Sequence, residues 1–186
     1  MDIRVSDEDL IKQIATGDRL ALDALYRRHG VRLYRFLLRL INNETIAEDI
    51  VSDVFFDVWQ QAGRFEARSS ASTWLFAIAR FKALSARRGR QHLELGSDEA
   101  MIEDPSDDPE NLMLKADKGK IIGRCLSKLS VLHREVIDLV YYHGKSIEEV
   151  GKILNIPENT VKTRMFQARK RLSELLATAG VDRGWP

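Results

Sequence analysis

Cysteine is nearly missing from this chain of 186 residues, because Cys125 is its only thiol. A disulfide within the chain is therefore excluded, as is a zinc site built from several thiolates. His29, His92, His133 and His143 do not follow a metal-ligand spacing, and the sequence has no glycine-rich phosphate loop and no nucleophile motif. These absences predict a protein without a metal or other cofactor that does not act as an enzyme by itself.

Long apolar runs are missing as well. No stretch approaches the roughly 18 apolar residues of a membrane-spanning helix. The first residues, MDIRVSDEDLIKQ, are acidic and have no apolar core, so they do not form a signal peptide. A single thiol also fits a reducing compartment. We therefore expect a cytoplasmic protein that is not inserted into a membrane.

The chain also lacks an excess of charge of either sign. It has 29 Lys and Arg residues and 28 Asp and Glu residues, which gives a net charge of +1. Such a balance would normally argue against a nucleic-acid partner, but the two signs are separated along the chain. Basic residues gather in the stretches ARFKALSARRGR and KTRMFQARKR, and acidic residues gather in ELGSDEAMIEDPSDD. The local charge is therefore more informative than the sum.

Alternating strand patterns of useful length do not occur, and apolar residues recur at helical spacing instead. The stretch DEDLIKQIA follows Ser6, a candidate N-cap. DRLALDALYRRHG and VRLYRFLLRLI form apolar helices that break or bend at Gly30. TIAEDIVSDVFFDVWQQAG opens with Thr45 and Glu48 in capping-box spacing, and TWLFAIARFKALSARRGRQ changes from apolar to basic.

The acidic stretch from 94 to 108 contains Pro105 and has no apolar face, which is typical of a linker. Helical patterns resume at Pro109. The sequence therefore predicts an all-α protein with two small helical domains joined by an acidic flexible linker. The predicted bounds are 1–93 for the first domain, 94–108 for the linker, 109–180 for the second domain and 181–186 for a tail.

The second domain contains a predicted helix-turn-helix in SIEEVGKILNIPENTVKTRM. Gly151 is small where two helices cross, Asn155 can adopt the left-handed conformation that ends a helix, and Pro157 prevents the first helix from continuing. In such motifs the second helix lies in the major groove of DNA, with its early residues at base edges.

This second helix is predicted to bury one face, formed by Val161, Met165, Ala168 and Leu172. On the other face, Phe166 suits contact with a thymine methyl group, and the cations suit phosphates or guanine. The alternative is an ordinary solvated face, with Phe166 folded back onto a neighbouring helix. The candidate DNA contacts are Asn159, Thr160, Lys162, Thr163, Arg164, Phe166, Gln167, Arg169 and Lys170.

Four stretches in this order resemble the extracytoplasmic-function sigma factors of bacterial RNA polymerase: YRRHGVRLYRFLLRL, AEDIVSDVFFDVW, STWLFAIAR and LSVLHREVIDLVYYHGKSIEEVGKILNIPENTVKTRMFQARKRL. The resemblance implies a promoter-recognition subunit that binds core RNA polymerase. Its first domain would open and read the −10 element as single strands, and its second would read the −35 element as duplex. It also implies an anti-sigma factor as a partner, and a linker that runs toward the RNA exit path unless it is only a spacer.

The resemblance also implies roles for residues of the first domain. Asp49, Ser52 and Asp53 match the family's polymerase-docking position, although acidic residues could simply solubilise this helix. The segment 65–72 resembles the loop that takes a base flipped out of the duplex. The candidate −10 contacts are Arg68, Ser72, Trp74, Arg80, Phe81, Lys82, Arg87 and Arg88, of which Trp74 could instead belong to the core.

The sequence departs from the family at one of these positions. The family commonly has ARN followed four residues later by Asp, whereas this chain has ARF followed by Ser85. Phe81 cannot form the hydrogen bonds of an amide. It therefore either stacks at the upstream edge of the melted DNA or reads a different −10 base. The remaining rival functions are a helix-turn-helix regulator that acts without polymerase and a bundle that only binds proteins.

Overall fold

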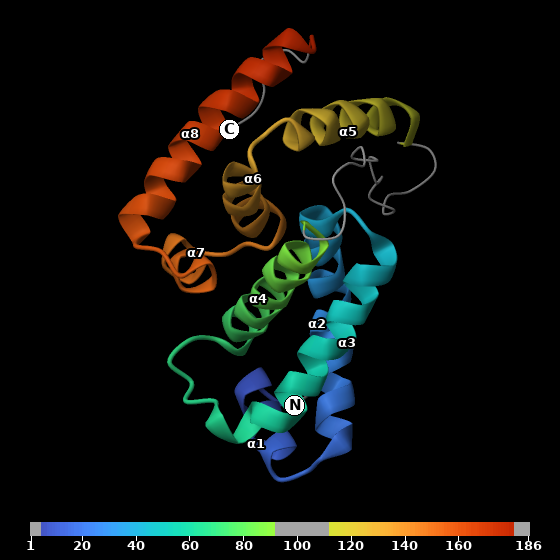
Figure 1. The fold of residues 1–186 in the computed structure, drawn as a ribbon, viewed down its shortest axis with the longest axis vertical. Helices are drawn as coiled ribbons and strands as arrows, with labels where there is room; N and C mark the ends of the chain where they lie inside the picture. The colour runs from blue at the N-terminus through green and yellow to red at the C-terminus, as the bar shows by residue number, and fades with distance from the viewer. Residues whose placement is uncertain (1–4, 92–111, 181–186) are drawn as a thin grey trace. The chain divides into compact units, whose positions relative to one another are not determined.

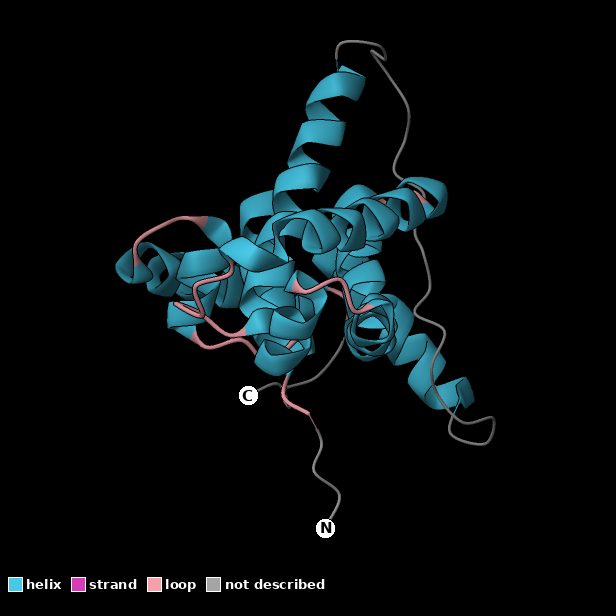
Figure 2. Cartoon of the chain, turned by 90° about the horizontal axis from the view of Figure 1, so that it is seen from below, coloured by secondary structure: helices cyan, strands magenta, loops and turns pink. Residues whose placement is uncertain are grey.

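The computed structural model describes residues 5–91 and 112–180, and its regular elements there are all helices (Figures 1 and 2), which confirms the all-α prediction. The predicted linker 94–108 and tail 181–186 lie outside the described residues. In chain order the elements are α1 (Asp7–Ala15), α2 (Arg19–Ile41), α3 (Glu44–Gln61), the 3₁₀ turn η1 (Ala62–Arg64), α4 (Ala71–Gln91), α5 (Leu112–Ser127), α6 (Val131–Ile137), the π-helical turn η2 (Asp138–Tyr142), α7 (Ile147–Leu154) and α8 (Glu158–Thr178).

The chain forms two compact units, and the first contains α1 to α4. Helix α2 packs against α1, α3 and α4, so its apolar stripe forms the centre of this unit. Leu25, Leu33, Phe36 and Phe76 are fully buried there. The Phe36 and Phe76 rings meet edge to face with centroids 5.2 Å apart, a favourable geometry for an aromatic pair. This core holds α3 and α4 in place, and each of them exposes one face.

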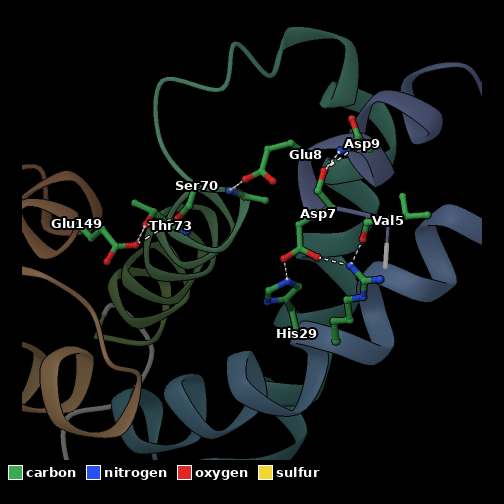
Figure 3. Close-up of polar contacts among 11 residues, drawn as sticks. Val5, Asp7, Glu8, Asp9, His29, Ser70, Thr73 and Glu149 are labelled. Atoms are coloured by element: carbon green, nitrogen blue, oxygen red, sulfur yellow. Dashed lines mark hydrogen bonds and ion pairs between the residues drawn. The ribbon is translucent and has the colours of Figure 1, made fainter. Parts of the chain in front are cut away.

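Polar contacts fix α1 against the rest of this unit (Figure 3). As predicted, Ser6 is the N-cap of α1, with its hydroxyl oxygen 3.1 Å from the backbone nitrogen of Asp9. The Asp7 carboxylate accepts hydrogen bonds from Arg28 at 2.8 Å and from His29 at 2.6 Å. At the start of α4, the Ala71 backbone N–H donates to the Glu8 carboxylate at 3.2 Å. Helix α1 therefore connects the middle of α2 with the first turn of α4.

The predicted break at Gly30 and the predicted cap at Thr45 were wrong. Helix α2 runs without interruption through Gly30, because Leu25 and Leu33 on either side of it are buried in the core and tertiary packing outweighs the weak helix propensity of glycine. Helix α3 begins at Glu44, and its N-cap is Asn43 rather than Thr45. The Asn43 side chain accepts a hydrogen bond from the Ile46 N–H at 3.0 Å, so the cap lies two residues before the predicted one.

Helices α5, α6 and α8 belong to the second unit, where α8 packs against α6 and α5. Cys125, Leu129, Val136 and Ile137 are buried in this unit. The predicted inner face of α8 is confirmed, because its four residues are all buried, and Leu176 extends that face by one turn. Helix α7 groups with the first unit, where the Glu149 carboxylate accepts hydrogen bonds from Thr73 at 2.7 Å and Ser70 at 3.2 Å (Figure 3).

Candidate nucleic-acid and polymerase interfaces

The turn before α8 has the predicted local geometry. Helix α7 ends at Leu154, and Asn155 then takes a left-handed conformation with φ of 52°. Pro157, with φ of −60° and ψ of 146°, occupies the N-cap position of α8. Because the backbone carbonyl of Pro157 accepts from Thr160 and Val161, the new helix starts within three residues of the turn. The sequence thus specifies where α7 ends and where α8 begins.

The outer face of α8 carries the predicted contact residues. Phe166 is 70% exposed, which decides against the alternative that its ring folds back onto a neighbouring helix. Thr160 and Arg164 are half-buried, and the other predicted residues of this face are exposed: Asn159, Lys162, Thr163, Gln167, Arg169 and Lys170. An exposed aromatic ring among cations on a helix suits contact with base edges and phosphates in a groove.

The charges of this face are available to a ligand. Among the residues that the structure describes, Lys162, Arg169 and Lys170 make no ion pair, whereas Arg171 pairs with Glu174 at 3.1 Å. The Thr163 hydroxyl donates to the Asn159 carbonyl at 2.9 Å, so toward a ligand it remains only an acceptor. The face therefore combines positive charge, one aromatic ring and few competing internal contacts.

Helix α4 exposes a second aromatic residue. Phe81 is 68% exposed, and Ser85 and Arg88, one and two turns later, are exposed as well. The Arg88 guanidinium lies 3.4 Å from the Ser85 hydroxyl, so its positive charge lies on the same side of the helix as Phe81. Of the other predicted −10 residues, Arg68 is exposed and paired with Glu66, and four are half-buried: Ser72, Trp74, Arg80 and Arg87.

Two of the predicted −10 residues have structural neighbours that the sequence did not indicate. The Trp74 ring packs against Phe65, in the loop before α4, with centroids 5.0 Å apart. Trp74 is thus half-buried and keeps part of its ring at the surface. The Lys82 ammonium lies 2.9 Å from Asp57 and 4.0 Å from Asp53, and the Lys82 side chain is only 21% exposed. Lys82 is thus held against α3.

The predicted polymerase-docking residues lie on the outer side of α3. Asp49, Ser52 and Asp53 are exposed, and the opposite side of the helix is buried in the core. Within the described part of the chain, Asp49 makes no ion pair, and Ser52 donates its hydroxyl to the Glu48 carbonyl at 3.2 Å. These residues form a negatively charged stripe whose carboxylates are largely available to a basic partner.

The sequence pattern did not single out Phe56, which lies on the same stripe and is 59% exposed. Its neighbour Phe55 is buried and packs edge to face against Tyr26, with centroids 4.9 Å apart. A signal was present, because Val54 and Phe55 continue the spacing of the buried pair Ile50 and Val51, and Phe56 falls outside that spacing. Only Phe55 fits the spacing of the buried residues, so Phe56 had to point outward.

Within residues 5–91 and 112–180, no three His, Cys, Asp or Glu residues come together in a way that could hold a metal ion. None of the helices described there combines the length and the apolar character that crossing a membrane requires.

Comparisons with known proteins identify the family of this chain. Residues 25–93 match the family described as Sigma-70 region 2, and residues 119–172 match Sigma-70, region 4, which together define a protein of the sigma-70 class. The chain is 31% identical to the ECF RNA polymerase sigma factor SigL of Mycobacterium tuberculosis over 171 residues, or 91% of this chain and 96% of the relative. SigK of Mycobacterium bovis is 28% identical over 176 residues, or 92% and 94% of the two chains. The chain therefore belongs to the ECF RNA polymerase sigma factors.

Solved structures agree with this assignment. The sigma factor RpoE of Bartonella quintana, solved in complex with the anti-sigma factor NepR, is 28% identical with a TM-score of 0.69, covering 87% of this chain and 98% of that one. CnrH, solved in complex with the cytosolic domain of CnrY, is 27% identical with a TM-score of 0.69, covering 92% and 97% of the two chains.

Proposed function

We propose that this chain binds core RNA polymerase and directs it to promoters, with α8 reading the −35 element as duplex and α4 contacting the melted −10 element. The observation that carries this proposal is the outer face of α8, where Phe166 is exposed among cations that make no ion pair within the described residues. Membership of the sigma factors supports it, because α4 and the candidate contact residues 159–170 of α8 lie within the matched regions. The protein then acts where the polymerase acts, in the cytoplasm.

Helix α8 would recognise DNA by two kinds of contact. Lys162, Arg169 and Lys170 would neutralise phosphates, which supplies affinity for any sequence and makes binding depend on salt. Asn159, Arg164 and Phe166 would contact base edges, where an aromatic ring suits a thymine methyl group and a guanidinium suits guanine. The residues of the first set determine position on the DNA, and those of the second set determine which sequence is preferred.

Helix α4 would act on single-stranded DNA. Phe81 offers a π-face to an unpaired base, and Arg88 on the same side of the helix offers a positive charge to the strand. Because stacking tolerates every base, Phe81 would support strand opening rather than discriminate a base by hydrogen bonds. Arg68, Ser72, Trp74, Arg80 and Arg87 would complete this surface around the loop before α4.

The acidic stripe of α3 would bind a basic surface of the polymerase through Asp49, Ser52 and Asp53. Complementary charges steer two proteins together and select the docked orientation. The same surface suits an anti-sigma factor, which would then compete with polymerase. The solved complex of the relative RpoE with the anti-sigma factor NepR supports this proposed mode of control.

The recognition helix is tested by substitutions in the full-length chain assembled with core polymerase. Lys162→Ala should weaken promoter binding for all sequences and reduce the salt slope by about one charge, whereas Phe166→Ala or Arg164→Ala should lose discrimination at particular −35 bases by roughly 1–3 kcal/mol. Arg171→Ala is the matched control, because the Arg171 charge is already paired with Glu174. Unchanged affinity and selectivity in all three test variants would contradict the assignment of α8.

A further inference from the structure

Phe56 is an exposed aromatic residue that does not belong to the core of the first unit. Its ring is 59% exposed, while the neighbouring Phe55 is buried and serves the core through its contact with Tyr26. A single exposed apolar residue is ordinary on a protein surface. The position of Phe56 relative to the charged residues of α3 is what makes it informative.

Helical spacing places Phe56 on the acidic stripe. It follows Asp49 by seven residues, Ser52 by four and Asp53 by three, and residues at these separations lie above one another on one side of a helix. All four are exposed. The stripe therefore consists of an aromatic ring at one end and two carboxylates along the preceding two turns.

Two of the five carboxylates of α3, those of Asp49 and Asp53, lie on this stripe. Asp57, which lies next to Phe56 in the chain, is half-buried and pairs with Lys82 at 2.9 Å. Asp53 lies farther from the same ammonium, at 4.0 Å, and its side chain is 66% exposed. Both carboxylates on the same side of α3 as Phe56 are thus exposed.

We propose that Phe56 is the apolar anchor of the polymerase-docking surface. Interfaces commonly combine an aromatic residue that becomes fully buried with charged residues at the rim. A basic amphipathic helix of core polymerase fits this stripe, because its cations would pair with Asp49 and Asp53 while its apolar side chains would enclose the Phe56 ring. This inference rests on the proposed function, since it deepens the docking role assigned to α3.

The test is equilibrium binding of the full-length chain to core polymerase at low and high salt. Phe56→Ala should weaken binding about 10- to 30-fold at both salt concentrations, because the lost contact is apolar and is not screened. The double variant Asp49→Ala, Asp53→Ala should weaken binding mainly at low salt. Leu20→Ala is the matched control, because Leu20 on α2 is 80% exposed and lies off the stripe, and it should change binding less than twofold.

A second variant separates anchoring from folding. Phe56→Leu keeps an apolar side chain of similar size and should retain binding within about fivefold of the wild-type chain, whereas Phe56→Gln should lose as much as Phe56→Ala. Helical content and thermal unfolding of each variant identify any that is misfolded. If Phe56→Ala and Phe56→Gln both fold and bind like wild type while the double aspartate variant is impaired, the anchor is refuted and the docking surface stands. If the aspartate variant also binds normally, the docking role of α3 fails.

Discussion

The Asp7 carboxylate makes the stability of the first unit sensitive to acid. Its partial burial acts to raise its pKa, but the hydrogen bonds and positive charges of Arg28 and His29 outweigh burial and hold the pKa of Asp7 below its ordinary value of 3.8. Because the pKa is lower in the folded chain than in the unfolded chain, these contacts stabilise the fold fully above pH 3.8. This contribution is lost as the pH falls through the folded-state pKa.

We therefore expect Asp7→Asn to lower the free energy of unfolding at pH 7, and we expect its difference from wild type to shrink between pH 5 and the most acidic pH at which the chain still folds. Urea unfolding followed by circular dichroism at several pH values measures this. Asp23→Asn is the control, because the Asp23 pair with Arg27 is exposed and joins neighbouring turns of α2. A difference for Asp7→Asn that stays the same at every pH would refute the account.

Phe81 gives a second prediction for a single residue. Phe81→Ala should slow promoter opening without altering the affinity for core polymerase, because each base that stacks on an aromatic ring gains about 1–3 kcal/mol. A promoter with an already unpaired −10 region should restore normal function to this variant. Phe81→Tyr should retain opening, and Ser85→Ala on the same side of α4 serves as the control. Fluorescence of a base analogue placed in the −10 element follows the opening.

An equal defect of Phe81→Ala on paired and unpaired templates would contradict the opening role. Discrimination of a particular base that is lost with the ring would instead support the other reading of this position, in which Phe81 selects a −10 base.

At the scale of the helix, periodicity predicted the buried face of α8 correctly, and local turn chemistry predicted the end of α7. The start of α3 was predicted wrongly because two consecutive asparagines, Asn42 and Asn43, have different roles at this point. Asn42 takes a left-handed conformation that ends α2, and Asn43 is extended and caps α3. The sequence offers several residues able to cap at this point, and only the path of the chain selects one.

Contacts between helices were beyond the reach of the sequence. Lys82 looked like one cation among several on α4, because nothing in the chain indicates that Asp57 on α3 faces it. Similarly, the place of Phe56 beside the acidic residues became clear only when their exposure was known. Contacts between side chains of different helices can be identified only from the structure.

Asn155 provides the prediction for the turn between α7 and α8. A residue with φ of 52° is strained unless it is glycine, asparagine or aspartate, so Asn155→Val should destabilise the chain by about 1–2 kcal/mol, whereas Asn155→Gly should change stability by only a few tenths. Thermal unfolding measures both. Asn155→Gly should also keep −35 selectivity. Equal stability of the valine variant and wild type would show that the turn does not depend on this conformation.

At the scale of the whole molecule, a net charge of +1 hides two surfaces of opposite sign. The acidic stripe lies on α3 in the first unit, and the basic face lies on α8 in the second. A protein that must bind both a basic protein surface and DNA needs such a separation, because one uniform charge would weaken one of the two contacts. The arrangement thus fits a subunit that connects polymerase to promoters.

The most direct test of this account is equilibrium binding of the purified chain to core RNA polymerase without any sigma subunit, measured by fluorescence anisotropy at two salt concentrations. We expect saturable binding that is weakened by salt and displaced by another sigma factor. A correctly folded chain that shows no saturable binding, yet still binds DNA through α8, would contradict it and would favour a regulator that acts on DNA alone.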